Sequence, residues 1–511
     1  MRRMGGLALG VILAVVLAAR GIGVGLAGPA EQPQRGGVLR VADEPPGGPF
    51  GVPWIMPVFG IIAAMPVYET LVWVDAYGRV SPRLAERWEV APDRKAIVLR
   101  LRRGVKFHDG TELTGEAVKF SLEESIKVRR LPAYIKSVDV LDRYTVRVNL
   151  EKWDNGVFLA LGGSAALIAS PATIQRLGQE RAQWQPVGTG PFRIVRYDPS
   201  SYADYVRFAQ YWDRGKPYLD RLEMRFIQDE QTRKAALLAH QLDIAGFGDP
   251  AIIAELRDTG RFRLITGPPG AGILMIIPDS VNSDSPFADR RVREALAYAV
   301  DRDAIARALG RGNWRPWNQI AHPFSPAALQ DYPGPSYNPA RAKELLAQAG
   351  YPNGFRTRVI KAFYLERDIA LAVQRYLQEV GIQAELETPE IGRYVEYQRK
   401  GWRGVLLHFY GYFPNFNNYI RFYFTNSPEG FVSMRRPEGL DRLVEESAST
   451  LTPQRHKLQQ VHRLLLQDYT VIPVFMAMRT YVAWPEVRDT QHLTKATWPY
   501  WEPAKAWKAR Q

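Results

Sequence analysis

The chain has 511 residues, of which 46% are hydrophobic and 23% are charged, and its formal net charge is +14 at pH 7. A chain of this length exceeds one ordinary core, so two or more domains are expected, and the composition excludes a largely disordered protein. The absence of cysteine excludes disulfides, thiolate metal sites and cysteine nucleophiles, while basic residues that alternate with acidic ones indicate a solvated surface and no nucleic-acid partner.

Residues 1–27 predict an export signal. Arg2 and Arg3 precede an apolar stretch at 4–19, and small residues follow at 25–27. The apolar stretch is shorter than the ~20 residues that span a bilayer, although an uncleaved membrane anchor remains the alternative. We expect cleavage near Ala27 and a periplasmic protein. Because no cysteine can carry a lipid, we do not expect a lipoprotein.

The next part of the chain predicts strands and one amphipathic helix. Residues 37–42 and 145–150 alternate apolar and polar side chains as strands do, and residues 96–101 are also predicted as a strand. Proline and glycine at 43–51 predict a loop. Thr114 is placed to cap a helix in which Val118, Leu122 and Ile126 form one buried stripe.

Two glycine-rich stretches follow. The stretch at 187–193 lacks the Lys-Ser/Thr pair and the helix of a phosphate-binding loop, so we interpret it as a tight turn where two backbones approach. A contact with ligand at this turn remains open. Proline and glycine at 264–272 predict a crossover from one lobe to a second.

The second lobe alternates strands with helices. Asp289, Asp301 and Asn338 are predicted helix caps. Downstream, a strand-helix-strand-helix-strand order predicts a parallel sheet with helices packed on it: residues 356–363, 368–380, 383–388, 391–400 and 404–409. Residues 440–469 are mostly helical, and a strand at 471–476 predicts the return crossover. The tryptophan-rich tail at 498–507 is expected to pack on a lobe.

Four ordered motifs resemble the family 5 extracellular solute-binding proteins, which serve ATP-driven (ABC) importers. They are Tyr-Glu-Thr-Leu at 68–71, Leu-Ala-Glu-Arg-Trp at 84–88, the stretch at 101–111 that contains Phe-His-Asp-Gly-Thr, and the helical stretch at 287–302. The resemblance implies an α/β, two-lobe periplasmic-binding-protein-like fold with a hinge near 266–273 and 472–480, and with a small β-rich subdomain in the first lobe. We expect the following boundaries: lobe I at 36–60, 181–270 and 475–511, the small subdomain at 61–180, and lobe II at 271–474.

The resemblance also implies a function. The protein is expected to capture a small-molecule ligand between its lobes and to deliver it to the permease subunits of an importer, as a monomer that closes around the ligand. A sensor that reports the ligand to a membrane partner is one alternative. A secreted hydrolase is another, but the sequence offers no nucleophile with a base and no facing carboxylates. We therefore expect no enzyme, no cofactor and no metal.

The loop at 407–419 is the predicted ligand contact, because it follows a strand of the parallel sheet. In the peptide receptors of the family an aspartate in this loop holds the free amino group of the peptide, and Tyr412 stands at that position here. An aromatic or apolar solute, including an amidated or anionic one, is therefore expected, and several of the aromatic residues could fill core instead. The predicted ligand-binding residues come from both lobes: Phe409, Tyr410, Gly411, Tyr412 and Asn415, with Phe50, Trp54 and Glu44. Arg129 and Arg130 are further candidates for a charged contact.

Overall fold

The computed structural model describes residues 32–268, 271–425, 430–493 and 501–510. Within it, Gln34–Gln511 form one compact unit. The expected signal peptide at 1–27 lies outside the described residues. In the part of the chain that is described, no helix is both long and apolar enough to cross a membrane.

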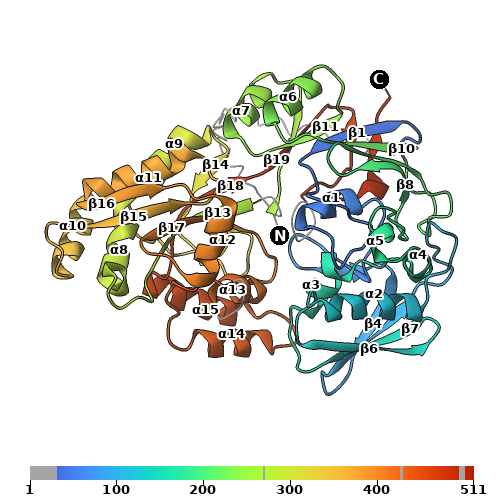
Figure 1. Ribbon diagram of the computed structural model, residues 1–511, viewed down its shortest axis with the longest axis horizontal. Helices are drawn as coiled ribbons and strands as arrows, with labels where there is room; N and C mark the ends of the chain where they lie inside the picture. The colour runs from blue at the N-terminus through green and yellow to red at the C-terminus, as the bar shows by residue number, and fades with distance from the viewer. Residues whose placement is uncertain (1–31, 269–270, 426–429, 494–500, 511) are drawn as a thin grey trace, which may run out of the picture. The chain divides into compact units, whose positions relative to one another are not determined.

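Lobe I is built on a seven-stranded sheet whose central strands are parallel (Figure 1). In spatial order the strands are β12 (Arg263–Ile265), β19 (Thr480–Ala483), β11 (Ile244–Phe247), β1 (Val38–Asp43), β10 (Arg221–Phe226), β9 (Tyr202–Arg207) and β8 (Phe192–Asp198). Its helices are α1 (Ile61–Ala64), α4 (Pro171–Leu177), α5 (Gln179–Ala182), α6 (Glu230–Leu238) and α7 (Pro250–Asp258). The predicted strand at 37–42 is β1.

Lobe II is built on a six-stranded sheet. In spatial order the strands are β14 (Trp314–Pro316), β18 (Ile472–Met478), β13 (Ala271–Pro278), β17 (Val405–Gly411), β15 (Phe355–Lys361) and β16 (Ile382–Glu387). The helices are α8 (Arg290–Ala299), α9 (Arg302–Gly310), α10 (Pro339–Gln348), α11 (Arg367–Glu379), α12 (Ile391–Lys400), α13 (Phe416–Phe424), α14 (Leu440–Ala448) and α15 (Arg455–Asp468). Because β15 is parallel to both β16 and β17, the predicted β-α-β-α-β order is confirmed.

The small subdomain is a four-stranded antiparallel sheet with α2 (Gly115–Lys127) packed on it (Figure 1). Its strands are β4 (Ala85–Val90), β5 (Ala96–Leu101), β7 (Thr145–Leu150) and β6 (Ile135–Asp142). A hairpin of β2 (Val72–Val74) and β3 (Val80–Pro82), and the helix α3 (Val157–Leu161), lie beside it in the chain. Its core runs from Leu71 to Ile168, a narrower span than the 61–180 expected, because α1 packs in the core of lobe I instead.

The chain passes between the two large sheets twice. It leaves β12 for β13 in the first crossover and leaves β18 for β19 in the second. Only Arg479 stands between β18 and β19. Both passages fall in the ranges expected for the hinge. The expected lobe boundary at 474 falls inside β18, which continues its pairing with β13 as far as Met478.

Three of the four predicted helix caps are confirmed. The side chains of Asp289, Asp301 and Asn338 accept hydrogen bonds from the first turns of α8, α9 and α10. Thr114 occupies the N-cap position of α2, but its side chain makes no capping hydrogen bond. The predicted start of the helix is therefore correct, but the predicted capping hydrogen bond from the Thr114 side chain is not made.

The tail packs back on lobe I, as expected for the part that is described. Trp501 is buried and its Nε1–H donates to the carbonyl of Ile62 at 3.1 Å. Trp507 belongs to β21 (Trp507–Lys508), which pairs with β20 (Val487–Arg488). The tail thus adds apolar burial to the core that contains the central sheet.

The turn at 187–193 brings two backbones into contact. A Cβ added at Gly188 would lie 2.2 Å from the carbonyl oxygen of Val67, and one added at Gly190 would lie 2.5 Å from that of Pro66. The amide of Gly190 donates to the Val67 carbonyl at 2.8 Å. Only glycine permits this approach, which supports the interpretation of the stretch as a tight turn.

Gly188→Ala is therefore expected to lower the free energy of unfolding by about 2–3 kcal/mol, because the added methyl group must displace backbone. Gly392→Ala is the matched control, since Gly392 lies in α12 with nothing within 4 Å of the added atom. Urea denaturation of both variants is the measurement. Equal stability of the two variants would contradict the close approach.

Candidate functional site

The loops that leave the parallel strands of both lobes lie at the crossovers. β13 begins just after the first crossover and pairs antiparallel with β17 and β18, so the carboxyl ends of β17 and β15 lie at the crossover edge of lobe II. In lobe I, β19 begins just after the second crossover and pairs Thr480 with Phe247, the last residue of β11. The carboxyl ends of β1, β10 and β11 therefore lie at the crossover edge of lobe I. Open α/β sheets bind ligands at such edges.

The loop after β15 presents two exposed aromatic residues at this edge. Phe363 is 44% exposed and Tyr364 is 46% exposed. Lys361 is buried, and its ammonium donates to the carbonyls of Ala362 and Leu365, which holds the loop in place. These two residues are not among those predicted from the sequence to contact the ligand. The rule that selected the loop after β17 would have found them, because they follow a strand of the same parallel sheet.

A neutral histidine supports Tyr364 from behind. The Nδ1 of His408 is 3.0 Å from the hydroxyl of Tyr364 and 2.7 Å from that of Tyr394 on α12. The Tyr364 hydroxyl also accepts the amide N–H of Phe409 at 3.3 Å. Burial lowers the pKa of His408 to about 3, so the ring stays neutral in ordinary solution. The phenol of Tyr364 thus ties the loop after β15 to β17, and the phenol of Tyr394 ties α12 to β17.

Residues of the predicted ligand loop differ in what they contact. Phe409 is half-buried, and its ring covers Gly272, where an added Cβ would come within 2.2 Å. Gly411 ends β17 and pairs with Gly272. Tyr410 is fully buried among aromatic rings, and its hydroxyl has no partner among the described residues. Tyr410 therefore fills core in this structure, as the alternative interpretation allowed.

Tyr412 and Asn415 join lobe II to the small subdomain. The hydroxyl of Tyr412 donates to the carbonyl of Ala76 at 2.8 Å, in the turn between β2 and β3. The amide of Asn415 donates to Asn155 Oδ1 at 2.9 Å. Both side chains are buried. The phenol that stands where the family resemblance places an aspartate thus bonds across the lobes.

A second set of bonds lies beside these two, and we name it the 152–156 contact. Asn155 donates from its backbone to Ala448 at 2.8 Å and from its side chain to Ser447 at 2.8 Å. The fully buried carboxylate of Asp154 pairs with Arg421 of α13. Lys152 pairs with Glu445 of α14 at 2.6 Å. The small subdomain therefore touches lobe II through a specific polar surface.

In lobe I, the loop after β1 buries the residues that were predicted to face the ligand. Phe50 packs on Tyr197 at 4.5 Å between ring centroids, and Trp54 packs on Phe120 at 5.7 Å. Both are buried in the core of lobe I. Ile55 and Phe59 of the same loop are 47% and 50% exposed. Phe50 and Trp54 therefore pack in the core and support the loop from inside. An irregular loop has no fixed alternation of buried and exposed residues, so its exposed side chains could not be predicted from the sequence.

The acidic residues at the end of β1 are neutralised. Glu44 is 3.0 Å from Arg479, which also pairs with Asp43, and Arg233 lies 3.9 Å from Asp43. Burial alone would lower the pKa of Arg479, but the two carboxylates raise it above the usual value. Glu44 is thus committed to an ion pair. Arg130 donates to the carbonyl of Met56 at 2.9 Å, which ties the loop to the small subdomain.

Several structures and sequences resemble this chain. The family described as "Bacterial extracellular solute-binding proteins, family 5 Middle" matches residues 79–431. The glutathione-binding protein GsiB of Escherichia coli O1:K1 is 30% identical over 357 residues, which cover 68% of this chain and 69% of that protein. The periplasmic binding protein DppA of Helicobacter pylori, solved with the peptide STSA, superposes with a TM-score of 0.79 at 20% identity, over 93% of this chain and 99% of that one.

HbpA2 of Haemophilus parasuis superposes with a TM-score of 0.81 at 23% identity, over 93% of this chain and 100% of that one. These likenesses confirm the expected two-lobe α/β fold. Among the residues that the structure describes, no group of three or more His, Cys, Asp or Glu side chains could hold a metal ion.

The bond from Tyr412 to Ala76 gives a testable contrast with its neighbour. Tyr412→Phe is expected to lower the free energy of unfolding by about 1 kcal/mol, because a buried hydrogen bond is lost and the Ala76 carbonyl is left without that donor. Tyr410→Phe is the matched control, since its hydroxyl has no described partner, and its stability is expected to be unchanged or higher. Chemical denaturation measures both, and an equal loss in the two variants would argue against the interlobe bond.

Burial of neutral His408 makes stability depend on pH. Its pKa is about 3 in the folded protein and about 6.5 in an unfolded chain, so between these values the unfolded state binds more protons. The stability that His408 contributes is therefore complete above about pH 6.5 and falls as the pH is lowered toward 3. His408→Gln is expected to reduce the slope of unfolding free energy between pH 6 and 4 by up to about 1.4 kcal/mol per pH unit.

The control for that slope is His456→Gln, because His456 is exposed at the start of α15. Its slope is expected to match that of the wild-type protein. If His408→Gln left the slope unchanged as well, His408 would not be held neutral by burial.

Proposed function

Because the chain belongs to family 5 of the bacterial extracellular solute-binding proteins, we propose that it captures a small solute between its two lobes and delivers it to the permease subunits of an ABC importer. The observation that carries the proposal is the meeting of both sets of parallel-strand carboxyl ends at two crossovers. The exposed aromatic residues at the edge of lobe II support a ligand site there. The relatives act as binding proteins, and we propose the same role, without catalysis, for this chain.

We propose that the ligand is held by aromatic faces and hydrogen bonds and not by a charge partner for a free amino group. Tyr412 replaces the aspartate, Glu44 is paired with Arg479, and the loop at 407–419 carries no acidic residue. Placing an unpaired ammonium in a closed cleft would cost several kcal/mol, more than a few hydrogen bonds of about 1 kcal/mol each would return. Relatives bind glutathione or a peptide, so a peptide-like solute with a blocked or solvent-exposed amino group fits both observations.

The proposed ligand contacts are Phe363, Tyr364, Phe409 and Gly411 in lobe II. Phe50, Trp54, Tyr410, Tyr412 and Asn415 would support them from the core and from the interlobe contact, and Glu44 from the hinge. We further propose that the protein is exported by a signal at 1–27, that it works in the periplasm without a lipid anchor, and that it is a monomer. N-terminal sequencing of exported protein tests the first of these points.

Native mass spectrometry of protein purified from its own periplasm tests the capture function. A bound small molecule is the expected result, and small-angle scattering should show compaction when that molecule is returned to stripped protein. Protein that carries no solute, and that shows no compaction with solutes extracted from the same periplasm, would overturn the proposal.

The ligand class is tested by calorimetry with glutathione and with dipeptides, each in free and N-acetylated form. We expect acetylation to change the dissociation constant by less than about threefold, because no carboxylate is available to pair with the amino group. Tight binding that acetylation weakens by more than tenfold would show that another acid holds the amino group, while leaving the capture function intact.

A further inference from the structure

Tyr412 spans the space between the first crossover and the small subdomain. Its amide donates to the carbonyl of Ala271, where β13 begins, at 3.1 Å. Its hydroxyl donates to the carbonyl of Ala76, in the turn between β2 and β3, at 2.8 Å. One residue therefore runs from the crossover edge of lobe II, where the solute is proposed to bind, to the small subdomain. We name Tyr412 and the turn at 75–79 the cleft wall.

Neighbouring side chains hold the cleft wall in this position. The ring of His322 lies edge-on to the Tyr412 ring at 5.2 Å between centroids, and the ring of Phe324 does so at 6.2 Å. Pro414 contacts the turn, since a Cβ added at Gly78 would lie 3.6 Å from the Pro414 carbonyl oxygen and 3.7 Å from the Pro414 Cβ. The phenol therefore cannot turn back into lobe II without displacing these two rings.

The cleft wall continues into the 152–156 contact. The side chain of Asn415 donates to Asn155 Oδ1 at 2.9 Å, and a Cβ added at Gly156 would lie 2.1 Å from Asn418 Oδ1. An extended peptide needs about 5 Å on each side to the backbone beside which it lies. It therefore cannot pass between two surfaces whose atoms are already within hydrogen-bond distance of each other.

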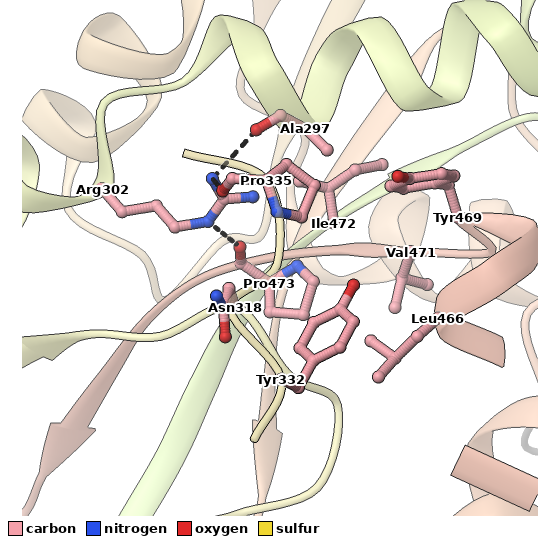
Figure 2. Close-up of a pocket in the computed structure, with 10 residues that line it drawn as sticks. All are labelled: Ala297, Arg302, Asn318, Tyr332, Pro335, Leu466, Tyr469, Val471, Ile472 and Pro473. Carbon is pink, nitrogen blue, oxygen red and sulfur yellow. Dashed lines mark hydrogen bonds between the residues drawn. The ribbon is translucent and has the colours of Figure 1, made fainter. Parts of the chain in front are cut away.

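The cavity that Figure 2 shows inside lobe II does not provide another place for the end of a solute. Its volume is about 10 Å³, which is room for one water molecule. The Arg302 guanidinium at its lining is used by backbone carbonyls, because Nε donates to Pro473 at 2.8 Å and Nη1 donates to Ala297 at 2.9 Å. A solute that meets the cleft wall therefore cannot continue into this part of lobe II.

We propose that Tyr412 limits the length of the solute, so that the protein takes short peptide-like solutes and rejects chains that would have to pass the cleft wall. The inference rests on the proposed capture of a peptide-like solute between the lobes. The limit is steric, because a longer chain must separate the phenol from Ala76 and, with it, Asp154 from Arg421. A chain that exposes a buried ion pair in this way binds more weakly than one that leaves the pair intact.

Calorimetry tests the limit with N-acetylated peptides that begin with phenylalanine and are extended by alanine to lengths of two to six residues. We expect the dissociation constant to fall with length at first and then to rise by at least about tenfold over one or two added residues. Equal or tighter binding of every longer peptide would overturn the length limit and leave the capture function intact. Failure of all the peptides to bind would contradict the peptide-like ligand of the proposed function, and this inference with it.

Substitutions at Tyr412 separate the effect of the ring from that of its hydrogen bond. Tyr412→Phe keeps the ring and is expected to keep the length limit. Tyr412→Ala removes the ring and is expected to bind the six-residue peptide at least about tenfold more tightly than the wild-type protein does. Lys152→Met is the matched control, because it removes an exposed ion pair with Glu445 from the same contact and should leave the limit unchanged. An unchanged limit in Tyr412→Ala would refute the role of the ring.

A cross-link tests the cleft wall without a change at Tyr412. The chain has no cysteine, and the Cβ positions of residues 78 and 414 lie 3.7 Å apart, as a disulfide requires. The positive φ of Gly78 makes a cysteine there less stable, but both peptides are compared in the same double variant. With Gly78→Cys and Pro414→Cys, mild oxidation is expected to form the disulfide about tenfold more slowly when the six-residue peptide saturates the protein than when the two-residue peptide does. Equal rates would show that the longer chain leaves the wall closed, and would overturn the proposal even if Tyr412→Ala did not fold.

Discussion

The ion pairs of Arg479 with Asp43 and Glu44 are the constraint on which the two-lobe arrangement depends. Asp43 is the last residue of β1, a central strand of lobe I. Arg479 is the single residue between β18 of lobe II and β19 of lobe I, and it pairs with Asp43 and Glu44. Tyr481 also donates to Asp43, so the first residues after the crossover converge on one carboxylate. Burying these charges is favourable only while they stay together, because any one left alone would bear its full desolvation cost. These ion pairs therefore fix the position of β19 relative to β1.

Much of the fold could be predicted because it is encoded locally. The order of predicted strands and helices at 356–409 predicts the parallel sheet, and Asp289, Asp301 and Asn338 predict three helix starts. The pairing of Arg479 with Asp43 could not be found in this way, since residues 436 apart in the chain meet only in the folded protein. The expected boundary at 474 falls inside β18, because nothing in the apolar run of this strand marks where its pairing with β13 stops.

The candidate site was predicted in part. The position of the loop after β17 follows from strand order, and that rule holds for any parallel sheet. Which side chains face the cleft does not follow, because packing decides it residue by residue. Trp54 is buried while its neighbour Ile55 is exposed, and Tyr412 bonds to Ala76 in another subdomain. Phe363 and Tyr364 also follow a strand end, but they were not predicted, because the resemblance to the family points to the loop after β17.

The 152–156 contact has a mechanical consequence. It joins lobe II to the small subdomain at elements that do not belong to the crossover strands, so any rotation of the lobes about the segment around Arg479 would have to break it. A bond at this contact resists such a rotation with a longer lever arm than the same bond next to Arg479 would have. Because Asp154 is buried only while Arg421 faces it, separation exposes both charges to water at once. Opening of the lobes would therefore carry the cost of separating a buried ion pair.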